Sequence, residues 1–142
     1  MTLAVSSKLP PMEAQSVDAV PEGDNWQYDP KWDGFRCLAF REQGKILLQS
    51  KSGQPLTRYF PDIVAALGSL GAKQFVLDGE IVIPIRRRFS FDELLMRIHA
   101  AESRVRMLAA KYPAMFVLFD LLANERGTSL VELPLHQRRR GV

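Results

Sequence analysis

Residues 31–41 read KWDGFRCLAFR, and the interpretation of the whole chain starts from this stretch. Its second half, residues 36–41, favours a β-strand, and residues 45–50 (KILLQS) form a second run of the same kind. The three residues between these runs are Glu42, Gln43 and Gly44, and the glycine suits a tight turn. The sequence therefore predicts a β-hairpin that begins directly after a group of charged residues.

Helical and strand patterns alternate along the rest of the chain. Residues 61–70 have apolar side chains at helical spacing, with Pro61 suited to the first turn and Gly71 to the end. Residues 74–85 are apolar except for Asp78-Gly79-Glu80, which predicts one strand or two strands around a kink. This order of elements favours an α+β fold.

The C-terminal half continues the same mixture. Ser90 and Glu93 have the spacing of a capping box, and the apolar stripe from residue 91 to residue 108 predicts a single helix that ends at Pro113. Residues 115–122 predict a buried strand interrupted by Asp120. A turn at residues 124–127 leads to one more short segment.

The composition limits the classes of protein to which this chain can belong. The 142 residues are 46% hydrophobic and 25% charged, as in one globular domain, so a disordered tail is excluded. The only cysteine, Cys37, excludes an intramolecular disulfide, and we expect a small buried side chain there. Residues 1–22 predict an extended leader and residues 23–142 the domain. Neither a secretory signal nor an apolar run of the roughly 20 residues that span a bilayer occurs, so a cytoplasmic location and no membrane partner are expected.

Charged residues interrupt apolar segments at four places, which is costly unless they have partners or bind a ligand. In the first, Lys31 and Asp33 are two positions apart, so in extended chain they point to one side. Gly34 permits a sharp turn, after which Arg36 can return to the same cleft. A lysine in a desolvated site has a lowered pKa and is a candidate nucleophile.

The segment from Lys31 to Arg36 resembles the K-x-D-G-x-R motif of covalent nucleotidyltransferases, which include ATP-dependent DNA ligases, RNA ligases and mRNA capping enzymes. Residues 50–53 (SKSG) are similar to the second motif of the family, with Lys51 in place of the usual arginine. Residues 75–82 and 116–122 are similar to the third and fourth motifs. The resemblance runs from residue 26 to residue 140. The residues in and around the motifs are most similar to those of bacterial ATP-dependent DNA ligases of the repair and end-joining type.

The resemblance implies an antiparallel-sheet nucleotidyltransferase fold and a reaction that uses ATP and Mg²⁺ on nicked or broken double-stranded DNA. It implies that Lys31 is the nucleophile that forms lysyl-AMP. It also implies contacts of Asp29 with the adenine amino group and of Phe119 with the adenine face. The remaining implied roles are phosphate or ribose binding by Arg36, Lys51 and Arg58, ribose or metal binding by Glu80, and support by Asp33, Gly34 and Asp78.

Alternative interpretations exist for these residues. Lys31 and Asp33 could form a salt bridge in a plain hairpin, Phe119 could be a core side chain, and Glu80 a buried carboxylate with partners. His99 and His136 are isolated and do not predict a metal site. The arginine clusters at residues 86–88 and 138–140 are typical of a solvated loop and a ragged terminus.

The later motifs of the family, a second glutamate and phosphate-binding lysines, do not occur in these 142 residues. We therefore expect a fold that is incomplete at the C-terminus, as in a truncated gene, a frame-disrupted copy or a cut fragment. On this interpretation the chain alone does not seal nicks at a useful rate. Alternatives are a catalytically silent nucleotide-binding remnant, a half that needs a complementing ligase half or end-joining proteins, and an RNA ligase or capping enzyme.

Overall fold

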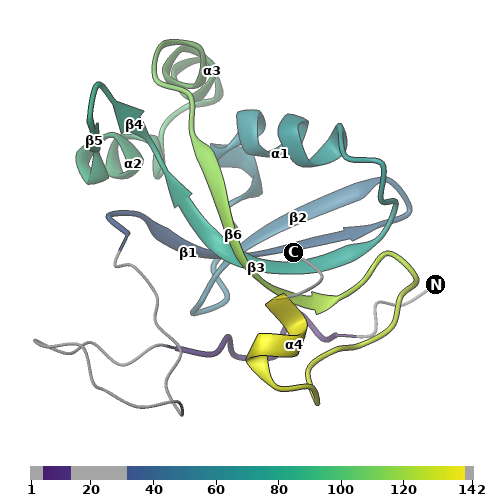
Figure 1. Ribbon diagram of the computed structural model, residues 1–142. Helices are drawn as coiled ribbons and strands as arrows, with labels where there is room; N and C mark the ends of the chain where they lie inside the picture. Colours follow the sequence, from purple (N-terminus) through teal and green to yellow (C-terminus); the bar gives the residue numbers. More distant parts are fainter. Residues whose placement is uncertain (1–4, 14–31, 140–142) are drawn as a thin grey trace, which may run out of the picture.

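A four-stranded antiparallel sheet lies at the centre of the computed structural model, which describes residues 5–13 and 32–139 (Figure 1). The strand order is β2-β1-β3-β6. The predicted α+β class is confirmed, because strands paired through antiparallel neighbours alternate with short helices rather than with parallel crossovers. The bounds of the four strands are Phe35–Glu42 for β1, Lys45–Ser50 for β2, Phe75–Val82 for β3 and Met115–Ala123 for β6.

The predicted hairpin is confirmed by β1 and β2. Glu42 pairs with Lys45, so Gln43 and Gly44 form a two-residue turn. Their φ angles are 49° and 80°, and two successive positive values are those of the turn whose twist matches paired strands. Glycine adopts this conformation at little cost.

The single helix predicted after residue 90 is wrong, because the structure has two helices, α2 (Phe91–Arg97) and α3 (Glu102–Lys111). The start is as expected, since the Ser90 side chain accepts a hydrogen bond from the Glu93 backbone N–H at 3.2 Å. Directly after Arg97 the backbone becomes extended at Ile98 and left-handed at His99, where φ is 62°.

The buried side chain of Arg97 explains this break. Its guanidinium binds both carboxylate oxygens of Asp62 at 2.7 and 2.8 Å and donates to the carbonyl oxygens of Tyr59 and Tyr112. These partners come from three other parts of the helical layer, so the chain must turn back after Arg97 to bring Tyr112 within reach. The apolar stripe continues through the break because α3 buries its own side chains against the same core.

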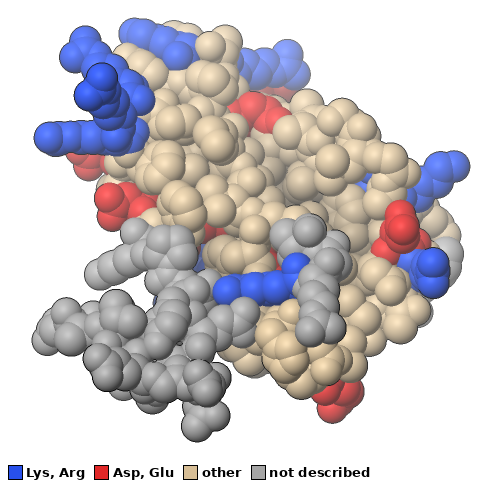
Figure 2. All heavy atoms as spheres, in the orientation of Figure 1, with Lys and Arg blue, Asp and Glu red and all other residues tan. Residues whose placement is uncertain are grey.

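The strand predicted over residues 74–85 is two strands, but the break does not lie at Asp78-Gly79-Glu80. These three residues are paired inside β3, and the second strand, β4 (Pro84–Ile85), forms a separate hairpin with β5 (Arg88–Phe89). Lys and Arg side chains gather around this hairpin and continue over α3 (Figure 2). The strand predicted over residues 115–122 is present as β6, but most of its positions are only partly buried. It is not interrupted at Asp120, which pairs with Asp78 of β3; the residues skipped in the pairing are Phe119 and Leu122.

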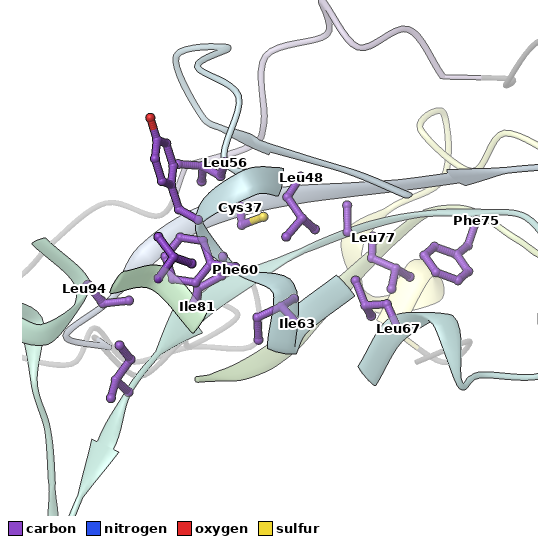
Figure 3. Packing of buried hydrophobic residues seen from close by; sticks show 14 residues of the cluster. Cys37, Leu48, Leu56, Phe60, Ile63, Leu67, Phe75, Leu77, Ile81 and Leu94 are labelled. Atoms are coloured by element: carbon purple, nitrogen blue, oxygen red, sulfur yellow. The ribbon is translucent and has the colours of Figure 1, made fainter. Parts of the chain in front are cut away.

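The main core lies between the sheet and the helices (Figure 3). The helical layer consists of the 3₁₀ helix η1 (Thr57–Tyr59), α1 (Pro61–Gly68), α2 and α3. Cys37 is fully buried there, as expected, and burial raises the pKa of its thiol to about 12. The core side chains drawn with labels are Cys37, Leu48, Leu56, Phe60, Ile63, Leu67, Phe75, Leu77, Ile81 and Leu94.

The other face of the sheet has a smaller apolar cluster and most of the buried charges. Leu38, Phe40, Val76 and Leu122 pack there with Val5, so this part of the expected leader contacts the sheet. The short helix α4 (Leu135–Arg139) also packs on β6. Within the described ranges, no helix is long and apolar enough to cross a membrane.

Candidate functional site

Charged side chains from three neighbouring strands meet on the face of the sheet opposite the helices; this surface is called the charged face below. Arg36 of β1 is paired in register with Glu80 of β3, and Asp78 of β3 with Asp120 of β6. Asp78 and Asp120 are 0% and 2% exposed. Two buried carboxylates side by side require cations, because an unpaired buried charge is strongly unfavourable.

Arg36 supplies the cation for Asp78 in a two-point ion pair. Arg36 Nε lies 2.7 Å from Asp78 Oδ1, and Nη2 lies 2.6 Å from Oδ2. Burial raises the pKa of the Asp78 carboxyl, the bond to Arg36 opposes this, and the neighbouring Asp120 carboxylate raises it further. The fork fixes the plane of the Arg36 guanidinium, which also donates to the Met12 carbonyl oxygen.

Phe119 is an extra residue in β6. Asp120 pairs with Asp78 and Leu118 pairs with Gly79, so Phe119 has no partner in the β3 register and forms a β-bulge. A bulge redirects a side chain, and the Phe119 ring lies 4.8 Å from the Arg36 guanidinium carbon. The ring is half-buried on the charged face rather than in the core.

Two arginines of α4 hold the other side of this arrangement. Arg138 binds both oxygens of Asp120, at 2.8 and 3.0 Å, and donates to the Leu133 carbonyl oxygen. Arg139 donates to the Phe119 carbonyl oxygen at 2.7 Å. The ragged terminus predicted for residues 138–140 is therefore wrong for Arg138, which is 4% exposed. The signal that could have revealed it was Asp120, since an acid inside an apolar strand needs a cation.

Glu80 is a half-buried carboxylate that makes no hydrogen bond or salt bridge with the described part of the chain. Burial raises the pKa of Glu80, Arg36 opposes this increase, and Asp33 and Asp78 add to it. No group of three metal-ligating side chains occurs among residues 5–13 and 32–139. Mg²⁺ commonly takes only one or two carboxylates together with nucleotide phosphates, so the Glu80 carboxylate fits this ion.

Gly34 and Gly79 lie where backbones approach closely. A Cβ on Gly34 would lie 2.3 Å from the Ile81 carbonyl oxygen, and a Cβ on Gly79 would lie 2.4 Å from the Val117 carbonyl oxygen. Both glycines therefore allow the strand pairing that aligns Arg36 with Glu80.

Lys51 follows β2 directly and is exposed at the edge of the charged face. Its Nζ lies 3.4 Å from Glu13 Oε1. A hollow of about 420 Å³ lies between the N-terminal segment and the end of β2. Its lining residues are Ser7, Lys8, Leu9, Pro10, Gln49, Lys51, Ser52 and Gly53.

The remaining sequence candidates lie apart from this group or outside the described residues. Arg58 is on η1, on the helical side of the sheet, with its guanidinium carbon 5.2 Å from the Tyr59 ring. Asp33 is exposed in the bend before β1. Lys31 and Asp29 lie outside the described residues, and Trp32, which follows Lys31, has its ring 5.5 Å from Phe89 of β5. The structure thus brings together Arg36, Asp78, Glu80 and Phe119.

Comparison with known proteins identifies the family. The profile described as "ATP dependent DNA ligase domain" matches residues 11–142. DNA ligase C of Mycobacterium tuberculosis is 48% identical over 123 residues, which are 87% of this chain and 34% of that protein. DNA ligase C1 of Mycolicibacterium smegmatis is 43% identical over 148 residues, which cover 100% of this chain and 42% of that protein.

A solved structure agrees with these relatives. Mycobacterial DNA ligase D, complexed with ATP and MES, superposes with a TM-score of 0.63 at 28% identity and covers 79% of this chain and 34% of that one. The chain spans about a third of the length of DNA ligase C. The antiparallel sheet and the four motifs therefore have one explanation: the chain belongs to the ATP-dependent DNA ligase domain family.

Proposed function

We propose that this chain provides the nucleotide-binding part of an ATP-dependent DNA ligase adenylation domain and that Lys31 is its nucleophile. The observation that carries the proposal is the Arg36 guanidinium, which Asp78 holds by two bonds beside the Phe119 ring. A fixed cation next to an aromatic face suits a nucleotide, because the cation binds phosphate or ribose oxygens and the ring stacks on the base.

The proposed reaction is a series of phosphoryl transfers. The neutral Lys31 amine attacks the α-phosphorus of ATP, a P–N bond forms, the bond to the bridging oxygen breaks, and pyrophosphate leaves while the amine loses a proton to solvent. An oxygen of the 5′-phosphate at a nick then attacks the phosphorus of the AMP group, and the P–N bond breaks as the Lys31 amine takes up a proton from solvent. Finally the 3′-hydroxyl attacks that phosphate and displaces AMP, which seals the strand. Each step concentrates negative charge at phosphorus, so cations around the phosphates lower the barrier.

Each residue of the site has a proposed role in binding the nucleotide. Arg36 and Lys51 neutralise phosphate oxygens or hold the ribose, and Phe119 supports the adenine. Asp29 contacts the adenine amino group. Glu80 holds Mg²⁺ together with the nucleotide phosphates. When bound, Mg²⁺ offsets the charge on those phosphates.

Several wider features belong to the same proposal. The proposed DNA substrate is nicked or broken duplex DNA, and the names of the relatives, which are DNA ligases, support DNA as the substrate class. We also propose a cytoplasmic location and, as partners, end-joining proteins or a complementing ligase half.

Covalent labelling tests the nucleophile. The chain is incubated with α-labelled ATP and Mg²⁺ and separated on a denaturing gel, and the labelled peptide is mapped. We expect an adduct on Lys31, which Lys31→Ala abolishes while the exposed control Lys45→Ala retains it. An adduct on Lys45 or Lys51 would contradict the assignment. ATP binding without any adduct would instead support the catalytically silent alternative.

A further inference from the structure

The β4–β5 hairpin carries three exposed arginines in succession, Arg86, Arg87 and Arg88, together called the arginine hairpin below. None of the three forms a salt bridge with another residue in the described ranges. Lys and Arg side chains continue from this hairpin over α3 (Figure 2). On α3 the exposed cations are Arg104, Arg106 and Lys111, of which Arg106 pairs with Glu102.

The turn of the hairpin places one of the arginines in a left-handed backbone conformation. Ile85 pairs with Arg88, so Arg86 and Arg87 are the two turn residues. Arg86 has a φ of 59°, a conformation that glycine or asparagine adopts more easily. Replacing Arg86 by glycine would therefore remove the guanidinium without straining the turn.

The arginine hairpin also lies beside the proposed adenylation site. Its Phe89 ring contacts Trp32, the residue that follows Lys31 in the sequence. Pro84, the first residue of the hairpin, comes two positions after the end of β3, the strand that carries Glu80. The hairpin therefore lies next to the residue that follows the proposed nucleophile, while the α3 cations lie on the helical side of the sheet.

We propose that the arginine hairpin, continued by the α3 cations, is a surface that binds backbone phosphates of duplex DNA. This inference rests on the proposed function, in which the chain belongs to an enzyme that must hold duplex DNA. Guanidinium groups match phosphate oxygens with two parallel hydrogen bonds, and a two-stranded ribbon has dimensions that fit a DNA groove. The exposed cations of the hairpin and of α3 are complementary in charge to the regularly spaced phosphates of duplex DNA.

A charge-reversal experiment with a matched control tests this surface. One variant of the full chain is Arg86→Glu/Arg87→Glu/Arg88→Glu. The control is Lys45→Glu/Lys73→Glu/Arg126→Glu, whose three residues are exposed at the opposite end of the sheet. Each variant replaces three cations by three anions, so both change the formal net charge from +3 to −3. Only the position of the charges differs.

Binding to a fluorescent nicked duplex is measured by anisotropy over a salt titration, without ATP. Each lost phosphate contact lowers the slope of log K against log salt by about 0.9. We expect the hairpin variant to lose about two to three units of slope and at least about tenfold in affinity at low salt. The control is expected to lose less than about threefold and to keep its slope. Equal losses in both variants, or a parent chain that does not bind DNA, would overturn the proposal.

The single variant Arg86→Gly separates binding from folding. Glycine relaxes the positive φ, so the unfolding temperature should stay the same or rise while DNA affinity falls by about threefold or more. Unchanged affinity in a folded Arg86→Gly chain would contradict a role for this side chain. Labelling of Lys31 needs no DNA, so it is measured separately. If the parent chain forms no adduct with labelled ATP, the proposed function is contradicted, whereas the DNA-binding measurement remains valid.

Discussion

Glu80 is a half-buried carboxylate whose negative charge lowers the stability of the folded chain. Burial raises the pKa of Glu80 above 4.5, with Arg36 opposing the increase and Asp33 and Asp78 adding to it. A carboxyl with a raised pKa in the folded state contributes most to stability when it is protonated. Its contribution is therefore complete below pH 4.5 and is lost as the pH rises through the folded pKa.

We expect Glu80→Gln to unfold at a higher temperature than the parent at about pH 7, because glutamine carries no charge to desolvate. The difference should shrink towards zero at about pH 4, where the parent carboxyl is protonated. Thermal unfolding followed by circular dichroism across this range provides the measurement, with the exposed Glu132→Gln as control. A gap of equal size at both pH values would show that charge at Glu80 is not the cause.

Glycine is required at residues 34 and 79 for a steric reason. A Cβ on Gly34 would lie 2.3 Å from a carbonyl oxygen of β3, and Gly79 has a similar neighbour on β6. We expect Gly34→Ala and Gly79→Ala each to reduce the free energy of unfolding by about 1–3 kcal/mol or more. Gly71→Ala, which meets no atom within 4 Å, should change it by less than about 0.5 kcal/mol. Urea unfolding of the three variants measures these free energies, and equal losses in all three would contradict the steric explanation.

At the scale of elements, α4 is attached to the sheet mainly through charge. The Arg138 side chain is 5% exposed. Its guanidinium neutralises Asp120, which is buried beside Asp78. Arg138→Met leaves that carboxylate without its cation, so we expect a loss of about 3–5 kcal/mol in the free energy of unfolding.

The double variant Arg138→Met/Asp120→Leu removes both charges and should recover most of this loss, because an apolar pair of similar volume replaces the buried ion pair. Denaturant unfolding of the single and double variants forms the test. A double variant no more stable than Arg138→Met would mean that packing of α4, rather than the unpaired carboxylate, determines the effect.

Elements that depend on neighbouring residues were predictable, and those that depend on distant partners were not. The β1–β2 hairpin and the start of α2 follow from a turn glycine and from the Ser90 cap, whose partners lie within a few positions. The end of α2 depends on Arg97 and Asp62, which are 35 positions apart. Likewise, the cation of Asp120 lies 18 positions away on α4. Apolar periodicity contains no information about such pairs, so it continued one helix through the break and left Arg138 in solvent.

For the whole molecule, the two faces of the sheet are protected unequally. Three helices and η1 cover one face, whereas the charged face is covered within the described ranges by residues 5–13 and α4. We expect amide hydrogen exchange to be slowest in the central strands β1 and β3 and faster in α4 and the edge strand β2. Exchange of α4 as slow as that of β3 would show that both faces open only in global unfolding.

The bulge at Phe119 has a consequence for insertions and deletions. Leu118 pairs with Gly79 and Asp120 pairs with Asp78, so removing residue 119 alone would leave these two pairs adjacent, with the separate register shift at Leu122 unchanged. Strand pairing alone is thus satisfied without the aromatic residue, so Phe119 is a residue that pairing with β3 does not require. In such a deletion the sheet would keep its inward and outward alternation, while the Arg36 guanidinium would lose its aromatic neighbour. A one-codon deletion in the gene would therefore remove the ring that we propose to support the adenine, while the pairing around it is kept.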